Sequence, residues 1–172
     1  MILENLVVSD TNIFLDLISV NLLDSFFKLP CDFSTTDFVI NEIIQPLQLK
    51  AIDKFVQAKK LEVVTFDFTE LSTINTMFTN SKNNTSMADC SVWYYAKETS
   101  GRLLTGDGKL RRSAEADGVK VSGILYIFDN LVEYGILKKH DAADILDQLS
   151  QINTRLPKTE CEKRILKWRN TK

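Results

Sequence analysis

The segment VVSDTNIFLDL, residues 7–17, passes from the pattern of a strand to that of a helix within a few residues. A short apolar run over residues 6–8 is followed by apolar residues at helical spacing from Ile13 to Ile18. Asp10 lies between the two patterns, where it or the next threonine can cap the helix. We therefore expect Asp10 just beyond the carboxyl end of a buried strand.

The rest of the chain repeats this alternation of strand and helix. Further strands are expected at residues 31–35, 61–66, 102–105 and 119–121. Helices are expected from residue 37 to about Pro46, and at 48–59, 69–78, 86–99, about 108–116, 124–134, 141–152 and 159–168. Such alternation favours βαβ units. We predict an α/β fold, in which three α/β/α layers with a central, mainly parallel sheet occupy residues 1–135, and a helical C-terminal extension, residues 136–172, packs on the same domain.

The composition is typical of a soluble globular protein. The 172 residues suit one domain, and hydrophobic and charged residues make up 44% and 26% of the chain. Three cysteines without close metal-ligand spacing indicate neither a disulfide framework nor a zinc site. The first residues do not resemble a signal peptide, and no apolar stretch approaches the roughly 18 residues that span a membrane. We expect a cytoplasmic protein.

The charges are unevenly distributed along the chain. Residues 155–172 hold seven basic and two acidic side chains, a net charge of +5, so the remaining chain carries −7 of the total of −2. An acidic body with a basic end is compatible with a metal site beside a phosphate-binding surface. A solvated, charged helix would also explain the basic end.

Four carboxylates are expected to meet at one edge of the predicted sheet. Asp10 and Asp107 both follow strands, and parallel sheets bind ligands outside the carboxyl ends of their strands. Asp89 lies in the first turn of a helix and can reach the same edge. Glu42 lies further inside its helix, with Asp37 as a nearby competitor, so that helix must lean over the edge. One aspartate alone could simply be a helix cap, but the joint pattern is more specific.

Clustered carboxylates need compensation of their charge. Two of them about 4 Å apart repel by roughly 4 kcal/mol at an effective dielectric constant near 20. They must bind protons or a cation, and oxygen ligands without histidine or cysteine suit Mg²⁺ or Mn²⁺. Such a site can activate water for attack on a phosphodiester. Asn12 and Thr105 would orient the ligands or bound water.

Four segments in this order resemble the PIN-domain nucleases: VVSDTNIFLDL at residues 7–17, VINEI at 39–43, SMADCSVWYYAKE at 86–98 and LLTGDGKLRRSAEADGVKVSG at 103–123. The resemblance spans about residues 5–135. In that family an aspartate followed by Thr-Asn ends the first strand, a second acid lies on the helix after the second strand, a third opens a later helix, and a fourth follows a Leu-Thr pair. The resemblance thus implies a catalytic and metal-binding set of Asp10, Glu42, Asp89 and Asp107.

The resemblance implies a Mg²⁺- or Mn²⁺-dependent endoribonuclease. Single-domain members of this size are commonly VapC-like toxins of type II toxin–antitoxin pairs. RNA, a cognate antitoxin protein and a second copy of the chain are then the expected partners. Lys109, Arg111 and Arg112, just after Asp107, are candidates for contacts with RNA phosphates, although a solvated helix face would have the same composition.

We expect the homodimer to form through helices early in the chain. Their apolar side chains would supply the interface, and these are Phe14, Leu17, Phe26 and Phe27. The same side chains would otherwise belong to the core of a single copy.

Three other functions fit the same residues less well. A receiver domain needs an acidic pair at its phosphorylated aspartate, which Asp10 lacks, and a late-strand lysine that Lys120 matches poorly. A phosphatase of the haloacid dehalogenase class needs Asp-x-Asp, whereas Asp10 is followed by Thr11 and Asn12. A PIN-fold module that binds nucleic acid or protein without catalysis is the main alternative.

Overall fold

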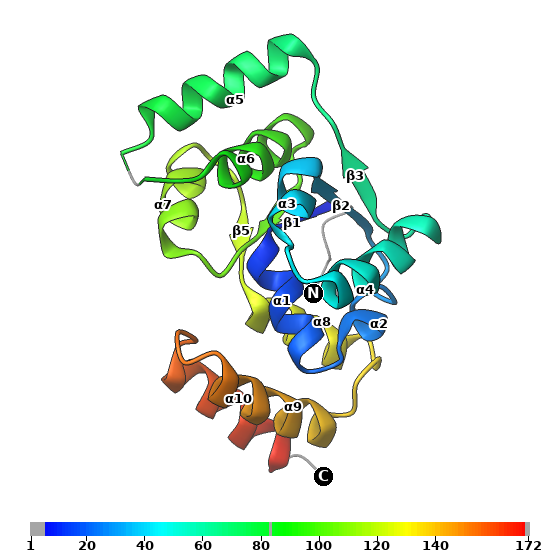
Figure 1. Cartoon of the computed structure of the whole chain (residues 1–172). Helices are drawn as coiled ribbons and strands as arrows, with labels where there is room; N and C mark the ends of the chain where they lie inside the picture. Colours follow the sequence, from blue (N-terminus) through cyan, green and yellow to red (C-terminus); the bar gives the residue numbers. More distant parts are fainter. Residues whose placement is uncertain (1–5, 83, 171–172) are drawn as a thin grey trace.

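A computed structural model describes residues 6–82 and 84–170 of the chain (Figure 1). Its centre is a five-stranded sheet with the order β3-β2-β1-β4-β5, and every pair of neighbouring strands is parallel. The strands are β1 (Leu6–Ser9), β2 (Asp32–Thr36), β3 (Glu62–Val64), β4 (Arg102–Leu104) and β5 (Val121–Ser122). On the central strand, Val8 pairs with Ser34 of β2 and with Leu103 of β4.

Helices connect the strands and complete the described chain. They are α1 (Thr11–Ser19), α2 (Leu23–Phe26), α3 (Asp37–Glu42), α4 (Pro46–Gln57), α5 (Phe68–Asn80), α6 (Met87–Thr99), α7 (Gly108–Ala116), α8 (Ile124–Glu133), α9 (Lys139–Ile152) and α10 (Lys158–Arg169). The predicted α/β/α architecture with a parallel sheet is confirmed. The short helix α2 was not predicted, because four residues show no periodicity.

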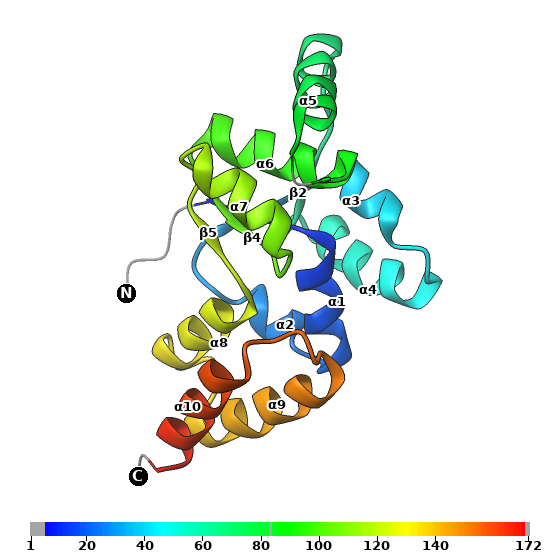
Figure 2. The same ribbon diagram turned by 90° about the vertical axis from the view of Figure 1, so that its left-hand side faces the viewer.

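The strand order explains where a binding site belongs. The chain runs outward from β1 through β2 to β3, returns to β4 beside β1, and continues outward to β5. Right-handed crossovers place the helices of the two halves on opposite faces, and Figures 1 and 2 show α6 and α7 on one side of the sheet and α1, α2 and α8 on the other. The direction of winding changes between β1 and β4, and α/β sheets bind ligands at the carboxyl ends of the strands that flank such a point.

The buried core corrects the predicted dimer surface. Phe14, Leu17, Phe26 and Phe27 are all buried within a single copy of the chain. Phe27 stacks on Phe55 of α4 with ring centroids 4.1 Å apart. These four side chains therefore stabilise the fold of one copy, and they cannot supply an interface between copies.

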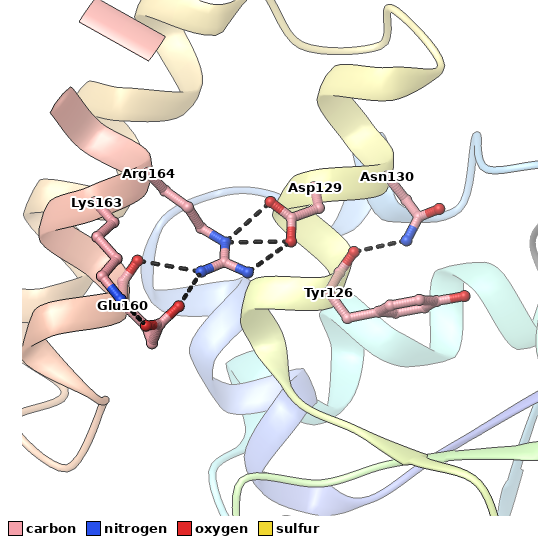
Figure 3. Close-up of polar contacts among 6 residues, drawn as sticks. All are labelled: Tyr126, Asp129, Asn130, Glu160, Lys163 and Arg164. Atoms are coloured by element: carbon pink, nitrogen blue, oxygen red, sulfur yellow. Dashed lines mark hydrogen bonds and ion pairs between the residues drawn. The ribbon is translucent and has the colours of Figure 1, made fainter. Parts of the chain in front are cut away.

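The C-terminal helices are fixed to the sheet domain by apolar and ionic contacts. Helix α9 packs against α8 and α1, and α10 packs along α9. Trp168 of α10 is buried and lies against Phe128 of α8. Figure 3 shows the guanidinium of Arg164 bridging the two helices, with Nη2 2.8 Å from Oδ2 of Asp129 and Nη1 3.2 Å from Oε2 of Glu160. Within the described residues, no helix is both long and apolar enough to cross a lipid bilayer.

Candidate active site

Asp10 is a buried carboxylate at the carboxyl end of β1. Its backbone N–H donates to the carbonyl of Leu104 at 3.0 Å, which fixes it beside β4. Its side chain is only 2% exposed. One carboxylate oxygen accepts from the backbone N–H of Thr11 at 2.7 Å, and the other accepts from Asn12 Nδ2 at 2.7 Å and from Thr105 Oγ1 at 2.8 Å. Asp10 is thus both the N-cap of α1 and the centre of a hydrogen-bond network.

Asp107 stands on the neighbouring strand end, after β4. Its backbone N–H donates to Thr105 Oγ1 at 3.0 Å, and its own Oδ1 accepts from the backbone N–H of Lys109 at 2.6 Å, so that it caps α7. Between Thr105 and Asp107 in the sequence, the backbone N–H of Gly106 donates to Asn12 Oδ1 at 2.7 Å. A Cβ atom at Gly106 would lie 3.1 Å from this same oxygen, which explains a glycine at this close approach.

Asp89 is held at the start of α6 by a reciprocal pair of hydrogen bonds. Its backbone N–H donates to Ser86 Oγ at 3.0 Å, and the backbone N–H of Ser86 donates to Asp89 Oδ2 at 2.7 Å. This capping box leaves the carboxylate partly buried in the first helical turn. The helix N-terminus also favours a negative charge at this position.

Glu42 reaches the site from the last residue of α3, and its side chain is exposed. Its Oε2 accepts from Thr11 Oγ1 at 2.5 Å, so it lies beside the start of α1. Helix α3 is itself fixed by Thr36, whose Oγ1 lies 2.7 Å from Ser91 Oγ of α6 in a fully buried contact. Asp37 instead accepts from the N–H of the next residue at the opposite end of α3.

The four acids interact electrostatically. The pKa of Asp10 is raised from 3.8 to about 7, chiefly by burial; the carboxylates of Asp89 and Glu42 add to this rise, and the hydrogen bonds from Thr105 and Thr11 oppose it. Burial also raises the pKa of Asp89, with added effects of Asp107 and Glu42 against the hydrogen bonds to Ser86. The structure therefore brings all four predicted acids to one edge of the sheet.

The donor set of this edge fits a hard divalent cation. The acids supply oxygen ligands, their polar neighbours are hydroxyls and amides, and neither histidine nor cysteine is among the contacts of their side chains described above. A cation would offset the two effects that raise the pKa of Asp10, which are its burial and, to a smaller extent, the carboxylates of Asp89 and Glu42. Across residues 6–82 and 84–170, however, no three His, Cys, Asp or Glu side chains are already grouped as a metal site. To share one cation, the carboxylates would thus have to approach one another more closely than they do here.

The three basic residues after Asp107 have different surroundings. Lys109 and Arg112 are exposed on α7. Arg111 is partly buried, and its guanidinium donates to the carbonyl of Val121 at 3.3 Å and lies 3.3 Å from the carboxylate of Glu115. Arg111 therefore braces α7 against the end of β5, whereas its two neighbours face solvent.

Sequence reasoning missed two residues that position the acids. Thr11 was noted only as a possible cap, but its hydroxyl contacts Glu42 across 31 positions of the sequence. Ser86 caps α6, and its reciprocal bond with Asp89 was not predicted either. The Ser-x-x-Asp spacing is a signal that could have found this second contact.

The chain thus has a parallel α/β sheet, and its acids gather at the switch point, where the direction of winding changes between β1 and β4. These features define a class of α/β proteins that bind a charged ligand at the carboxyl ends of their strands. The family model described as PIN domain matches residues 6–170, so the chain belongs to the PIN-domain family. PIN domains are generally nucleases, and the chain therefore has a nuclease-type fold. The match also covers α9 and α10. A search of curated proteins finds no match to the sequence.

Proposed function

We propose that this protein is a Mg²⁺- or Mn²⁺-dependent endoribonuclease that hydrolyses RNA phosphodiester bonds. The observation that carries the proposal is the convergence of Asp10, Glu42, Asp89 and Asp107 from four separate segments onto the switch point of a PIN-family sheet. Carboxylates crowded at one edge cost free energy unless they bind protons or a cation.

The chain's own residues would act as ligands and as supports for the ligands. Asp10, Asp89, Asp107 and Glu42 would hold the cation, which supplies charge neutralisation at the phosphate and an activated water. Thr105 and Asn12 keep the Asp10 carboxylate in place through donated hydrogen bonds. Hydrolysis would break the bond between phosphorus and the 3′-oxygen, leaving a 5′-phosphate and a 3′-hydroxyl.

Exposed cations beside the acids support a polyanionic substrate. Lys109 and Arg112 lie on the first turns of α7, directly after Asp107, and their side chains are free to meet RNA phosphates. The position of Arg111 favours a structural role, because its guanidinium is engaged with the end of β5.

We further propose that the protein is the toxin of a VapC-like type II pair, acting in the cytoplasm and inhibited by a cognate antitoxin. Support comes from the resemblance and from two large apolar side chains close to Glu42. Ile44 is 89% exposed and Leu47 is 82% exposed, and both follow Glu42 closely in the sequence, so they are available for contact with a protein partner. The homodimer stays a prediction without an assigned surface.

The test is incubation of the protein with single-stranded and structured RNA in Mg²⁺ or Mn²⁺, with EDTA in parallel. We expect cleavage only with the metal, and products that carry 5′-phosphates. Metal binding without turnover on any RNA would favour the alternative, a PIN-fold binding module without catalysis. Cleavage that persists in EDTA would contradict the metal requirement.

A further inference from the structure

We propose that the turn between α9 and α10, residues 153–157, and the first residue of α10 form a second RNA-phosphate-binding surface through Arg155 and Lys158. The inference rests on the proposed function, and it adds substrate contacts far from the acids in sequence. It also gives a role to the basic end of the chain, whose charge pattern stands out from the acidic remainder.

The turn is tied to the helix that starts at the candidate active site. Asn153 Nδ2 lies 3.0 Å from both carboxylate oxygens of Asp16, which is on α1. Asn153 Oδ1 accepts from the backbone N–H of Arg155 at 3.1 Å, so the same side chain also shapes the turn. Helix α1 begins directly after Asp10. Figures 1 and 2 place this turn on the side of the molecule where α7 begins.

Among residues 6–82 and 84–170, the salt bridges of the C-terminal hairpin involve Lys163, Arg164 and Arg169, but neither Arg155 nor Lys158. Arg155 does interact electrostatically with Asp16: burial raises the pKa of Asp16, while the hydrogen bond from Asn153 and then the charge of Arg155 lower it. The amide of Asn153 contacts both oxygens of Asp16, and the Arg155 side chain is exposed. Lys158 is exposed as well. Both cations are thus available to an anionic partner.

Other basic residues of the C-terminal hairpin do have structural partners. Arg164 bridges to Asp129 (Figure 3), and Arg169 contacts Asp144 at 3.0 Å and Asp147 at 3.2 Å. These ion pairs hold α10 against α8 and α9. Together with the contacts of Asn153, they fix the backbone of the turn, so a phosphate that binds there has only the two cationic side chains to order.

The turn and α7 would contact RNA from opposite sides of the acids. Helix α7 covers one face of the sheet and carries Lys109 and Arg112, whereas the turn packs on α1, which covers the other face. The acidic edge between them repels phosphates unless cations flank it. A single strand crossing this edge would meet one pair of cations on each side of the bond to be cleaved.

The test compares two double variants in an Asp107→Asn background, which separates binding from cleavage. Arg155→Gln/Lys158→Gln removes the proposed contacts, and Lys59→Gln/Lys60→Gln removes two exposed charges before β3, at the opposite edge of the sheet. Binding of a fluorescent single-stranded RNA is measured by anisotropy from 50 to 200 mM salt. Two lost phosphate contacts should lower the slope of log affinity against log salt by about 1.4. The ratio of the affinity of the Asp107→Asn protein to that of the Arg155→Gln/Lys158→Gln variant should then fall about sevenfold between 50 and 200 mM salt.

The control variant should keep the parent's salt dependence, and Arg155→Lys should keep most of the affinity. Lys158→Gln alone serves as a variant that should fold normally, since the side chain is exposed on the first residue of α10. It should still lose part of the salt dependence. With the catalytic residues intact, Arg155→Gln/Lys158→Gln should raise KM more than it lowers kcat. If its salt dependence and KM equal those of the control while the unaltered protein cleaves RNA, the inference is wrong and the proposed function stands. If the unaltered protein cleaves no RNA, both are overturned.

Discussion

The hydroxyl of Thr105 donates a hydrogen bond of 2.8 Å to the carboxylate of Asp10 and accepts one of 3.0 Å from the backbone N–H of Asp107. Thr105 is fully buried. One side chain therefore connects two acids that follow the neighbouring strands β1 and β4. Since the winding of the sheet changes direction between these strands, the contact fixes the geometry of the sheet edge at which we propose the chemistry occurs.

Thr105→Val should weaken both stability and activity. Valine keeps the shape of the side chain but leaves the N–H of Asp107 without its partner and removes a donor to Asp10. We expect the free energy of unfolding to fall by about 1–3 kcal/mol, and cleavage to fall roughly 10- to 100-fold, as for other residues that orient metal ligands. Thr105→Ser, which retains the hydroxyl, is the matched control. Denaturant unfolding and kcat/KM provide the readouts, and equal effects of valine and serine would exclude a role for the hydroxyl.

Asp10 should make the metal-free protein less stable as the pH rises. Its pKa is raised from 3.8 to about 7 in the folded state, so the folded protein holds this proton where the unfolded chain has lost it. The stability contribution is therefore most favourable below about pH 4, declines up to about pH 7, and is constant above. The full loss is on the order of 4 kcal/mol. Denaturant unfolding in EDTA should show that the free energy of unfolding falls less between pH 5 and pH 8 in Asp10→Asn than in the unaltered protein. An unchanged pH dependence in that variant would refute the assignment.

A divalent cation should stabilise the folded protein. A ligand that binds only the folded state at 100 times its Kd adds about 2.7 kcal/mol to the free energy of unfolding. We expect Mn²⁺ or Mg²⁺ to raise the Tm of the unaltered protein at pH 8, and to raise it much less in Asp10→Asn or Asp107→Asn. Differential scanning fluorimetry with and without the metal gives the comparison. Equal shifts in all three proteins would place the metal elsewhere.

Glu42 and Asp37 provide a matched pair at the two ends of α3. Glu42 contacts Thr11 at the start of α1, whereas Asp37 accepts only from its neighbour's backbone N–H in the contacts of the described chain. Glu42→Gln should lower kcat/KM by about tenfold or more, whereas Asp37→Asn should leave kcat/KM near that of the unaltered protein, because a first-turn charge acts on the stability of its helix. The reverse order of effects would show that Asp37 is the second acid of the site.

The positions of Asp10 and Asp107 could be predicted because local patterns define them. Each follows an apolar run and precedes a helix, so each had to stand at a strand end, and a parallel sheet brings strand ends to one edge. Asp89 was predictable from its place in a first helical turn. The bond between Thr105 and Asp10 was not predictable, since a contact over 95 positions depends on strand order.

The location of Glu42 and the fate of the early apolar residues lay beyond local patterns. An acid inside a helix reaches the site only if the helix leans correctly, and the buried pair of Thr36 and Ser91 that fixes α3 joins residues 55 positions apart. Likewise, an apolar stripe does not reveal what covers it. Phe14 and Phe27 were predicted at an interface, and both lie in the core.

Cleavage of RNA by the Asp10→Asn variant tests the central claim most directly. Asparagine preserves the size of the side chain but removes the charge around which the network is built. In Mn²⁺ at pH 8, with folding verified by circular dichroism, the unaltered protein should cut RNA and Asp10→Asn should be roughly 100-fold slower or worse. Cleavage by the variant at the rate of the unaltered protein would contradict the account, because the acids at the sheet edge would then not be its active site.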